Sequence, residues 1–267
     1  PLERHGTAMT TSKAAVTNRE WPDASGVKQA HDKGVRGAGV LVGVLDTGVD
    51  ADHDEFQGVT IPYRYVSFFP DSPYWPPRDV RGYDTDGHGT HVAGIIAGRH
   101  VGVAPESQLY AATVIESETT RTSLIRVVYG LSWLLRSFGA PGNENRPAIL
   151  NLSLGFPPSP PPDMSPDDYT SALSAMARLI DTLRQANVLP VIAIGNEGPG
   201  NYGYPGAFPN VLGVGAVDFQ RSVASFSGSG LGKPDLVGYG VAVHSSLERD
   251  YSGHSIYRRL SGTSMAT

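Results

Sequence analysis

The sequence predicts an α/β fold in which a mostly parallel central sheet carries helices on both faces, giving three layers. Short runs that are continuously apolar and rich in Val, Ile and Leu are typical of strands buried on both faces. Segments with helical spacing alternate with these runs, which indicates parallel strands joined by crossover helices. The predicted strands are Val40–Leu45, Gln108–Ile115, Ala148–Leu152, Val188–Ile194 and Val211–Val217.

Three segments between the strands repeat apolar residues with helical spacing, and we predict helices there. In the longest of them, Leu173, Met176, Ile180 and Leu183 fall on one face, as expected of a helix that covers a sheet. Such helices form the crossover connections that parallel strands need. The predicted helices are Thr90–Ala97, Leu124–Phe138 and Tyr169–Ala186.

The chain has 267 residues, which is the size of one large α/β domain or two small ones. No linker-like change in composition divides it. We therefore predict an N-terminal extension over residues 1–34, packed on a domain that spans residues 35–267. The tract Pro157–Pro162 suits neither a central strand nor a helix interior and is predicted to be a stiff surface loop.

The composition argues against several classes of function. The formal net charge is −5, whereas a nucleic-acid-binding protein is expected to carry a basic patch. The absence of cysteine excludes disulfides, thiolate catalysis and thiolate-bound zinc. No apolar run approaches the length that spans a bilayer. We therefore expect no nucleic-acid partner and no membrane span, and the cellular location stays open.

Polar residues close several predicted strands. Asp46 ends the first strand, Ser153 follows another, and Asn196 comes shortly after a third. In open parallel sheets, ligands bind at the carboxyl ends of the strands. The sequence therefore predicts that its chemistry takes place along this edge of the sheet.

Two further residues have the chemistry to act with Asp46. His88 lies between glycines at the start of a predicted helix, and Ser264 lies in a turn of small residues that could open another helix. A serine nucleophile needs a base to take its proton, and that base needs an orienting group. The amide of Asn196 and the backbone N–H of Ser264 could stabilise an oxyanion.

These segments resemble those of the subtilisin-like serine peptidases, the subtilases. Asp-Thr-Gly at 46–48, His-Gly-Thr-His-Val-Ala-Gly at 88–94 and Gly-Thr-Ser-Met-Ala at 262–266 match the three triad signatures of that family, in its order. Gly-Asn-Glu-Gly at 195–198 lies between the second and the third. Each motif alone is weak to moderate, but together they are very specific. The resemblance covers residues 35–267.

The resemblance implies a subtilisin-like fold and a serine endopeptidase that acts through an acyl-enzyme intermediate. In such an enzyme Ser264 attacks the peptide carbonyl, His88 shuttles the proton, and Asp46 orients His88. Asn196 would hold the oxyanion together with the Ser264 N–H. Activity should then rise with pH as His88 loses its proton.

The same resemblance assigns residues to substrate binding. Residues 153–155 and 193–196 would form two walls of the pocket for the residue before the scissile bond, with Gly203 at its floor. Residues 115–122 would pair with the substrate backbone as an added strand. The residues implied in this way are Ser153, Leu154, Gly155, Ala193, Gly195, Gly203, Ile115, Glu116 and Glu118.

Two segments beside this pocket differ from the family. Glu116 and Glu118 replace a glycine-rich run, and they could favour a basic residue upstream of the cut or simply be solvated loop carboxylates. The tract Pro157–Pro162 follows the predicted pocket wall and could form a rim or lid, or be an ordinary surface loop.

The resemblance implies no cofactor for the chemistry and no catalytic metal. A structural calcium ion is typical of secreted subtilisins, but the inserted loop that holds it is absent, so Glu55 lacks its expected co-ligands. One alternative is a metal site in which His91 joins His88 and either Asp84 or Asp86. The other histidines, His5, His31, His53, His100, His244 and His254, are predicted to lie on the surface.

In the family the chain continues beyond the serine as a long buried helix. We therefore interpret residues 35–267 as a catalytic domain without its C-terminal part. The expected partners are a protein or peptide substrate and, besides it, a propeptide or the remaining C-terminal piece. The alternative is a non-catalytic, peptide-binding fragment that is inactive without that helix. The resemblance favours a secreted or cell-surface location, although nothing in the sequence excludes the cytoplasm.

Overall fold

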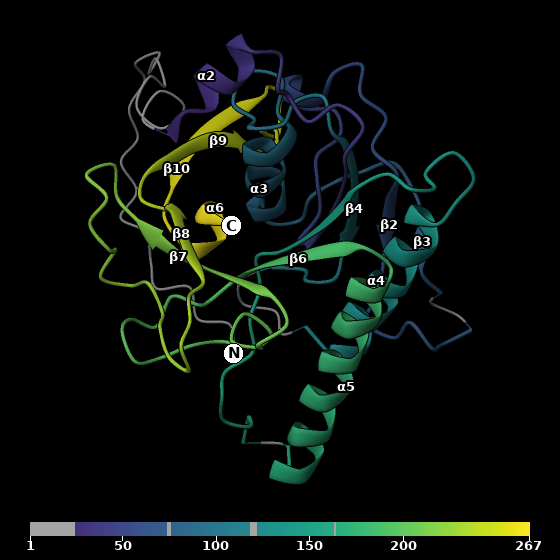
Figure 1. Ribbon diagram of the computed structural model, residues 1–267. Coiled ribbons are helices and arrows are strands. Elements are labelled where there is room, and N and C mark those ends of the chain that lie inside the picture. Colours follow the sequence, from purple (N-terminus) through teal and green to yellow (C-terminus); the bar gives the residue numbers. More distant parts are fainter. Residues whose placement is uncertain (1–24, 74–75, 118–121, 163) are drawn as a thin grey trace.

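The computed structural model describes residues 25–73, 76–117, 122–162 and 164–267 (Figure 1). Eight strands form one sheet in the order β3-β2-β4-β1-β5-β6-β7-β8, and β9 and β10 form an antiparallel pair. Within the large sheet only β2 and β3 pair antiparallel. The strands are β1 (Leu41–Asp46), β2 (Tyr63–Tyr65), β3 (Arg78–Asp79), β4 (Gln108–Thr113), β5 (Ala148–Leu152), β6 (Val188–Ala193), β7 (Leu212–Val217), β8 (Leu236–Tyr239), β9 (Val243–Leu247) and β10 (Ile256–Leu260).

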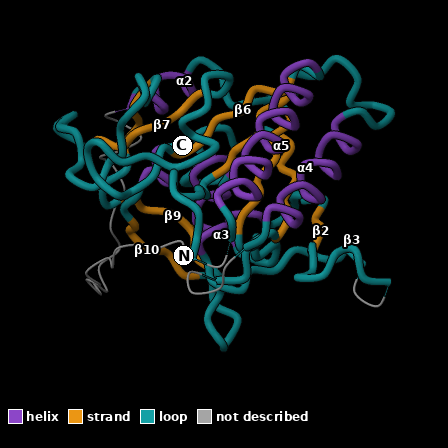
Figure 2. Tube along the Cα trace, turned by 90° about the horizontal axis from the view of Figure 1, so that it is seen from below, coloured by secondary structure: helices purple, strands orange, loops and turns teal. Residues whose placement is uncertain are grey.

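Helices cover both faces of the sheet, which confirms the predicted three-layer α/β fold. The helices α4 and α5 lie side by side on one face, as Figure 2 shows, and α3 and α6 pack on the other. No helix in the described part of the chain is long and apolar enough to cross a bilayer. The helical segments are α2 (Val27–Asp32), the 3-10 helix η1 (Asp54–Phe56), α3 (His88–Ala97), α4 (Leu124–Phe138), α5 (Pro166–Gln185) and α6 (Thr263–Ala266).

The central strand β1 separates two hydrophobic cores. Successive side chains of a strand point to opposite faces of its sheet. Leu41 and Leu45 accordingly belong to the core under α4 and α5, whereas Val42 and Val44 belong to the core under α3. All six residues of β1 are buried. This double burial explains why the strand is a continuous apolar run in the sequence.

The five strands and three helices predicted from the sequence are all present, with ends shifted by a few residues at most. The helix α5 begins at Pro166, three residues before the predicted start at Tyr169. The prediction missed this first turn because the turn carries no apolar periodicity. The Ser165 hydroxyl caps that turn by accepting a hydrogen bond from the Asp168 amide at 3.1 Å. The short strands β2, β3 and β8 and the β9–β10 hairpin were not predicted.

The described part of the N-terminal segment contacts the larger unit. Val27 of α2 packs against the core under α3. A ring nitrogen of His31, Nε2, lies 2.8 Å from the Val103 carbonyl oxygen. Both contacts lie on the α3 side of the sheet.

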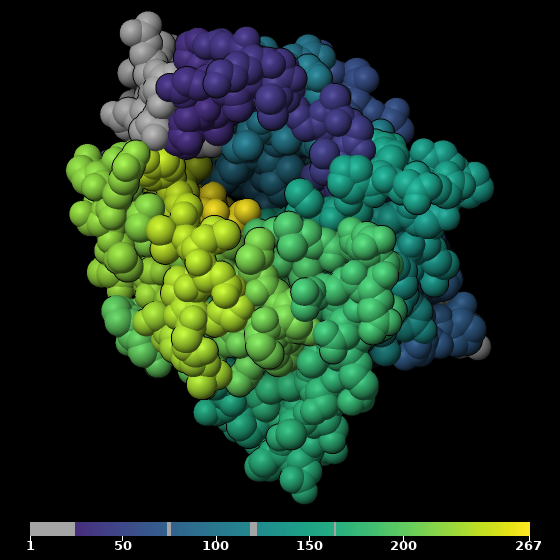
Figure 3. Space-filling view, viewed as in Figure 1, coloured from purple at the N-terminus to yellow at the C-terminus, as the bar shows by residue number. Residues whose placement is uncertain are grey.

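An apolar cavity of about 680 Å³ lies on the same side. Its walls include Val42 and Ile149 from the sheet, Ile96 from α3 and Met265 from α6. Figure 3 shows the surface hollowed beside the C-terminal residues. The short helix α6 therefore borders open apolar space on one side and α3 on the other.

The start of α3 lies directly on the turn that follows β1. A methyl group on Gly89 would overlap the carbonyl oxygen of Gly48 and would lie 3.1 Å from the Asp46 Cβ. Only a residue without a side chain permits this approach. Gly89 therefore sets how closely the first turn of α3 lies to Asp46.

Replacing Gly89 with alanine should separate α3 from β1. Because the added methyl group meets backbone atoms that cannot rotate away, we expect Gly89→Ala to lower the free energy of unfolding by about 1–3 kcal/mol. Gly139→Ala is the matched control, since the nearest atom to its added methyl group lies 3.5 Å away. Urea unfolding of both variants measures the effect. Equal stability of the two would contradict the close approach.

Candidate active site

Asp46 and His88 are in contact at the carboxyl end of β1. Asp46 is the last residue of that strand, and His88 is the first residue of α3. His88 Nδ1 lies 2.6 Å from Asp46 Oδ1, and both side chains are almost fully buried. An ionised carboxylate can only accept, so Nδ1 carries the proton and Nε2 of the neutral ring is left as an acceptor. This is the geometry of a base held by an orienting carboxylate.

The loop before α3 is attached to β1 through the carboxylate of Asp84. Its Oδ1 accepts hydrogen bonds from Thr47 Oγ1 at 2.8 Å and from the Gly87 amide at 3.0 Å. Its Oδ2 accepts from the Thr90 amide at 2.7 Å and from the Thr90 hydroxyl at 2.6 Å. Gly87 is the N-cap residue of α3, and Asp84 satisfies amides at this end and ties the first turn, with His88, to β1. An acidic residue shortly before a predicted helix is the sequence signal that could have revealed this role.

Ser264 lies in α6, which packs against α3 and β7. Its hydroxyl donates to the Ser153 carbonyl oxygen at 3.2 Å, and the Ser153 hydroxyl lies 3.2 Å from the Ser264 carbonyl oxygen. Within the described ranges no hydrogen bond joins Ser264 to His88. The structure therefore places the helix with the serine beside the helix with the histidine, and turns the hydroxyl toward Ser153.

The side chain of Asn196, which follows β6, faces the start of α6. Asn196 Oδ1 accepts hydrogen bonds from the Thr263 amide at 2.8 Å and from the Thr263 hydroxyl at 3.0 Å. A backbone amide can only donate, so this contact directs the amide oxygen toward Thr263 and leaves Nδ2 as a donor. The preceding turn uses Gly195 with φ of 114°, a conformation that favours glycine.

The segments predicted to form the substrate pocket are neighbours in the structure. The Gly203 amide donates to the Ile194 carbonyl oxygen at 2.7 Å. Phe156 and Tyr204 exchange two backbone hydrogen bonds, at 2.7 and 2.8 Å, so the chain after β5 pairs with the segment around Gly203. The residues assigned to the pocket that lie in these segments are Ser153, Leu154, Gly155, Ala193, Gly195 and Gly203.

The proline-rich tract begins directly after the Phe156–Tyr204 pair. Its first residues, 157–159, are exposed. The Tyr169 hydroxyl of α5 donates to the Pro157 carbonyl oxygen and ties the start of the tract to that helix. The tract is therefore a surface loop whose first residue is fixed close to the predicted pocket wall.

Glu116 follows β4 and is engaged in an ion pair. Its Oε1 accepts a hydrogen bond from the Tyr65 hydroxyl at 2.7 Å and lies 2.9 Å from Arg126 Nη2. Arg126 is fully buried. The expectation of a solvated Glu116 is wrong, because this carboxylate compensates a buried guanidinium. Ile115 beside it is buried, and Glu118 lies outside the described residues.

The metal-dependent alternative has no support in the site. His91 is fully buried, and its Nε2 lies 3.0 Å from the Arg258 carbonyl oxygen. Burial lowers the pKa of His91 to about 3, so the ring is neutral near pH 7. Asp84 has both oxygens occupied by protein donors. Among the described residues, no group of three or more His, Cys, Asp or Glu side chains could hold a metal ion.

The surroundings of Glu55 do not fit calcium. Glu55 is fully buried, and its Oε1 accepts a hydrogen bond from the Tyr257 hydroxyl at 2.8 Å and lies 3.2 Å from His100 Nδ1. Its Oε2 accepts from the amides of His100 at 2.8 Å and Val101 at 3.3 Å. Calcium needs six to eight oxygen ligands, whereas this carboxylate is surrounded by donors. Among the described residues, the recorded partners of the Glu55 carboxylate are hydrogen-bond donors.

These hydrogen bonds also determine the charge state of Glu55. Burial raises the pKa of this carboxyl, but the hydrogen bonds from His100 and Tyr257 outweigh burial and hold the pKa below its usual value. Glu55 is therefore ionised near neutral pH.

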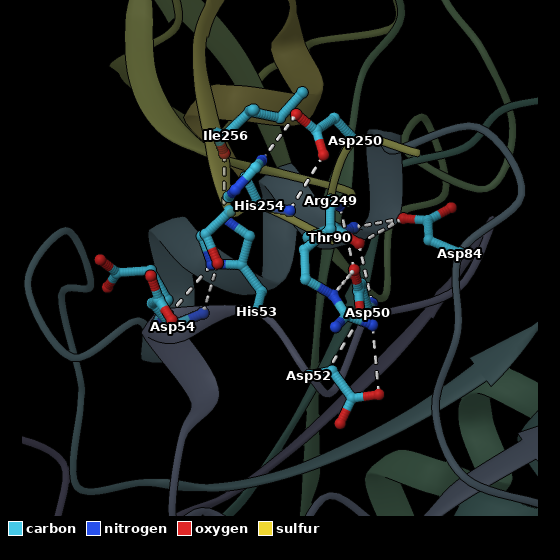
Figure 4. Close-up of polar contacts among 12 residues, drawn as sticks. Asp50, Asp52, His53, Asp54, Asp84, Thr90, Arg249, Asp250, His254 and Ile256 are labelled. Carbon is cyan, nitrogen blue, oxygen red and sulfur yellow. Dashed lines mark hydrogen bonds and ion pairs between the residues drawn. The ribbon is translucent and has the colours of Figure 1, made fainter. Parts of the chain in front are cut away.

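The prediction that His53 lies on the surface is wrong. The β9–β10 hairpin covers it, and its ring is fully buried. His53 Nδ1 accepts a hydrogen bond from the Glu55 amide at 3.1 Å, and Nε2 lies 2.9 Å from the Ile256 carbonyl oxygen (Figure 4). The hairpin was not predicted, so its cover over His53 could not be foreseen.

The family of the chain follows from a comparison with known proteins. The model of the subtilase family, Peptidase_S8, matches residues 37–267. The chain therefore belongs to the subtilase family of serine peptidases.

Individual relatives are also proteases by name. The chain is 58% identical over 257 residues to subtilisin-like protease PopC of Myxococcus xanthus, covering 95% of this chain and 54% of PopC. It is 37% identical over 244 residues to subtilisin Savinase of Lederbergia lenta, covering 89% of this chain and 76% of Savinase. A crystal structure of a cold adapted subtilisin-like serine proteinase matches with a TM-score of 0.63 and 31% identity, covering 87% of this chain and 72% of that one. The chain thus spans about half the length of PopC.

Substitution of Glu55 tests whether its hydrogen bonds take the place of an ion. Glu55→Gln puts an amide donor among donors, so we expect a loss of about 1–3 kcal/mol in the free energy of unfolding at neutral pH. The folded-state pKa of Glu55 is lowered, so this stabilisation is present above the usual value of 4.5 and is lost as the pH falls through the folded-state pKa. The difference in free energy of unfolding between Glu55→Gln and the unchanged protein should therefore become smaller in acid.

The same variant isolates the contribution of calcium at this position. Calcium and a chelator should shift the Tm of Glu55→Gln and of the unchanged protein equally. Asp54→Asn, a change at the exposed neighbour, should alter stability by no more than about 0.5 kcal/mol. A calcium shift that disappears in Glu55→Gln would show that Glu55 binds the ion.

Proposed function

We propose that this chain hydrolyses peptide bonds in proteins or peptides as a serine endopeptidase. The observation that carries the proposal is the buried hydrogen bond between Asp46 and His88, beside the helix that bears Ser264. Membership of the subtilase family and the protease names of its relatives support it.

In the proposed reaction Ser264 is the nucleophile. Its Oγ attacks the carbonyl carbon of the scissile bond while His88 Nε2 takes the hydroxyl proton. The hydroxyl first has to leave the Ser153 carbonyl oxygen, and we expect a rotamer change at Ser264 to turn it. His88 then gives the proton to the leaving amine, and water hydrolyses the acyl ester by the same route.

Asp46 stabilises the charged state of His88 in this scheme. Its Oδ1 accepts from His88 and from the Thr47 amide, at 2.6 and 2.7 Å. Its Oδ2 is buried and has no hydrogen-bond partner in the described part of the chain. A buried carboxylate with so few donors is stabilised when the neighbouring ring becomes an imidazolium. The pair therefore favours the proton transfer that starts the reaction.

Asn196 is proposed to stabilise the oxyanion together with the Ser264 amide. Thr263 holds the Asn196 oxygen, so the Nδ2 group is left to donate. Loss of such a donor lowers turnover about 100- to 1,000-fold in subtilisin, a relative of this chain. The pocket segments around Gly203 are proposed to bind the residue before the scissile bond, and glycine there leaves room for a large side chain.

A fluorophosphonate probe tests the proposed nucleophile. We expect the probe to label Ser264 and no other serine, because only an activated hydroxyl reacts quickly. Ser264→Ala should abolish labelling, and His88→Ala should slow it by at least about a thousandfold. Mass spectrometry of the labelled peptide identifies the site. A folded protein that is not labelled would contradict the proposal and favour a peptide-binding role without catalysis.

Glu118 is proposed to favour a basic residue upstream of the scissile bond. Glu116 is paired with Arg126, which leaves Glu118 as the carboxylate of this segment to be tested. We expect Glu118→Gln to reduce the preference for Lys or Arg over Gln about three- to tenfold, the size of a partly screened charge pair. The measurement is kcat/KM for peptides varied upstream of the cut. Glu106→Gln, an exposed change elsewhere, is the control, and an unchanged preference in Glu118→Gln would refute the proposal.

A further inference from the structure

The strand β9 lies along α3 and ends at its first turn. The Ser245 hydroxyl donates to the His91 carbonyl oxygen at 2.9 Å, and the Ser246 hydroxyl donates to the Thr90 carbonyl oxygen at 3.0 Å. The next residue, Leu247, is buried, and its side chain lies against Gly87. The strand therefore delivers the residue that follows it, Glu248, to the N-terminal end of α3.

The Glu248 carboxylate lies directly against Gly87, the residue before His88. A methyl group on Gly87 would overlap Glu248 Oε2, so no side chain separates the carboxylate from the backbone at this point. Glu248 Oε2 is buried and has no hydrogen-bond partner among the described residues. A buried oxygen without a partner in a native fold calls for an explanation.

The position of Glu248 is fixed by the residue after it. The Arg249 amide and Nε both contact Asp50 Oδ2, at 3.0 and 2.9 Å, and Arg249 Nη2 lies 3.2 Å from Asp52 Oδ2. Asp50 in turn is tied to α3, because its amide donates to the Thr90 hydroxyl at 2.9 Å. Figure 4 shows this chain of contacts from Arg249 through Asp50 and Thr90 to Asp84. The hairpin is thus held at the end of α3, and Glu248 with it.

The start of a helix normally stabilises a carboxylate by donating its free amides. Here three of the amides at this end already have acceptors, since Asp84 binds the amides of Gly87 and Thr90, and Thr47 Oγ1 accepts from Gly89. Glu248 therefore carries its charge near α3 without receiving these hydrogen bonds. Its negative charge therefore interacts electrostatically with the charged groups around the start of α3.

The charged groups that face Glu248 come from two elements. Asp84 and Asp86 precede α3, and Arg258 lies on β10. His88 follows Gly87, the glycine that the Glu248 carboxylate contacts. Burial raises the pKa of Glu248, a hydrogen bond from its own backbone amide lowers it, and the two aspartates raise it against the opposing Arg258, to about 7. Glu248 therefore gains its charge in the range in which an imidazole base acts.

We propose that Glu248 is a positioning residue for His88, and that its negative charge against the first turn of α3 favours the imidazolium that His88 forms during catalysis. The proposal rests on the serine peptidase function proposed above. Above neutral pH the charged carboxylate stabilises the transition state, in which the ring carries the proton of Ser264. Below neutral pH the protonated carboxyl no longer contributes this stabilisation.

The test is the ratio of rates between the unchanged protein and Glu248→Gln across pH. The rates are those of fluorophosphonate labelling of Ser264 and kcat/KM for a peptide, from about pH 5 to about pH 9. Because the amide imitates the protonated carboxyl, the ratio should be close to one in acid. It should rise to about three- to tenfold in alkali, the effect of one nearby charge, with a midpoint at about pH 7.

Two further variants make the result decisive. Glu248→Ala removes the carboxyl altogether and should give the same rise of the ratio with pH, whether or not it lowers the Tm. Asp250→Asn removes one charge from the same hairpin, where its Oδ1 accepts from the amides of Ser252 and His254, and it should give a ratio that does not depend on pH. A pH-independent ratio in both Glu248 variants would overturn the inference. Failure of the unchanged protein to be labelled at any pH would instead overturn the proposed function.

Discussion

The contact between the start of α3 and the end of β1 is the constraint on which the whole site depends. A glycine in the first turn of the helix lets its backbone lie on the turn after β1. Asp84 then binds two amides at this end and the Thr47 hydroxyl, which ties the start of the helix to the turn after β1. The imidazole of His88 consequently meets Asp46 with both side chains buried. The helix α6 and the strand β9 both pack on this helix.

Four carboxylates surround α3, and the donors that each receives account for their different roles. Asp84 and Glu55 each accept several hydrogen bonds from backbone and side chains, so they hold the helix and its C-terminal end in place. Asp46 accepts from the imidazole and one amide, and its other oxygen is buried without a hydrogen-bond partner in the part of the chain that the structure describes. Glu248 Oε2 also has no hydrogen-bond partner among the described residues. Carboxylates with few donors are the ones whose charge is felt by a neighbouring base.

The sequence predicted the elements whose signal is local and missed those that depend on tertiary contacts. β1 and β5 were recognisable because burial on both faces makes a strand uniformly apolar. The residues expected to carry the chemistry were recognisable because they stand in short motifs at strand and helix ends. The β10 strand was not, since most of its side chains are exposed and its pattern lacks an apolar face. Because the hairpin was not predicted, the burial of His53 and the contact of Glu248 with Gly87 could not be predicted either. The contact between Glu116 and Tyr65 was missed because the two residues lie far apart in the sequence.

The hairpin that was missed has a mechanical consequence. Its first strand binds the opening turns of α3 through Ser245 and Ser246, and its second strand reaches the other end of that helix through Tyr257 and Glu55. The β9–β10 hairpin is therefore connected to α3 near both ends of the helix. A force applied to the exposed tip at Tyr251 would be transmitted to both ends together, so the imidazole cannot shift without loosening the far end as well. Helix and ribbon should open and close as a single cooperative body.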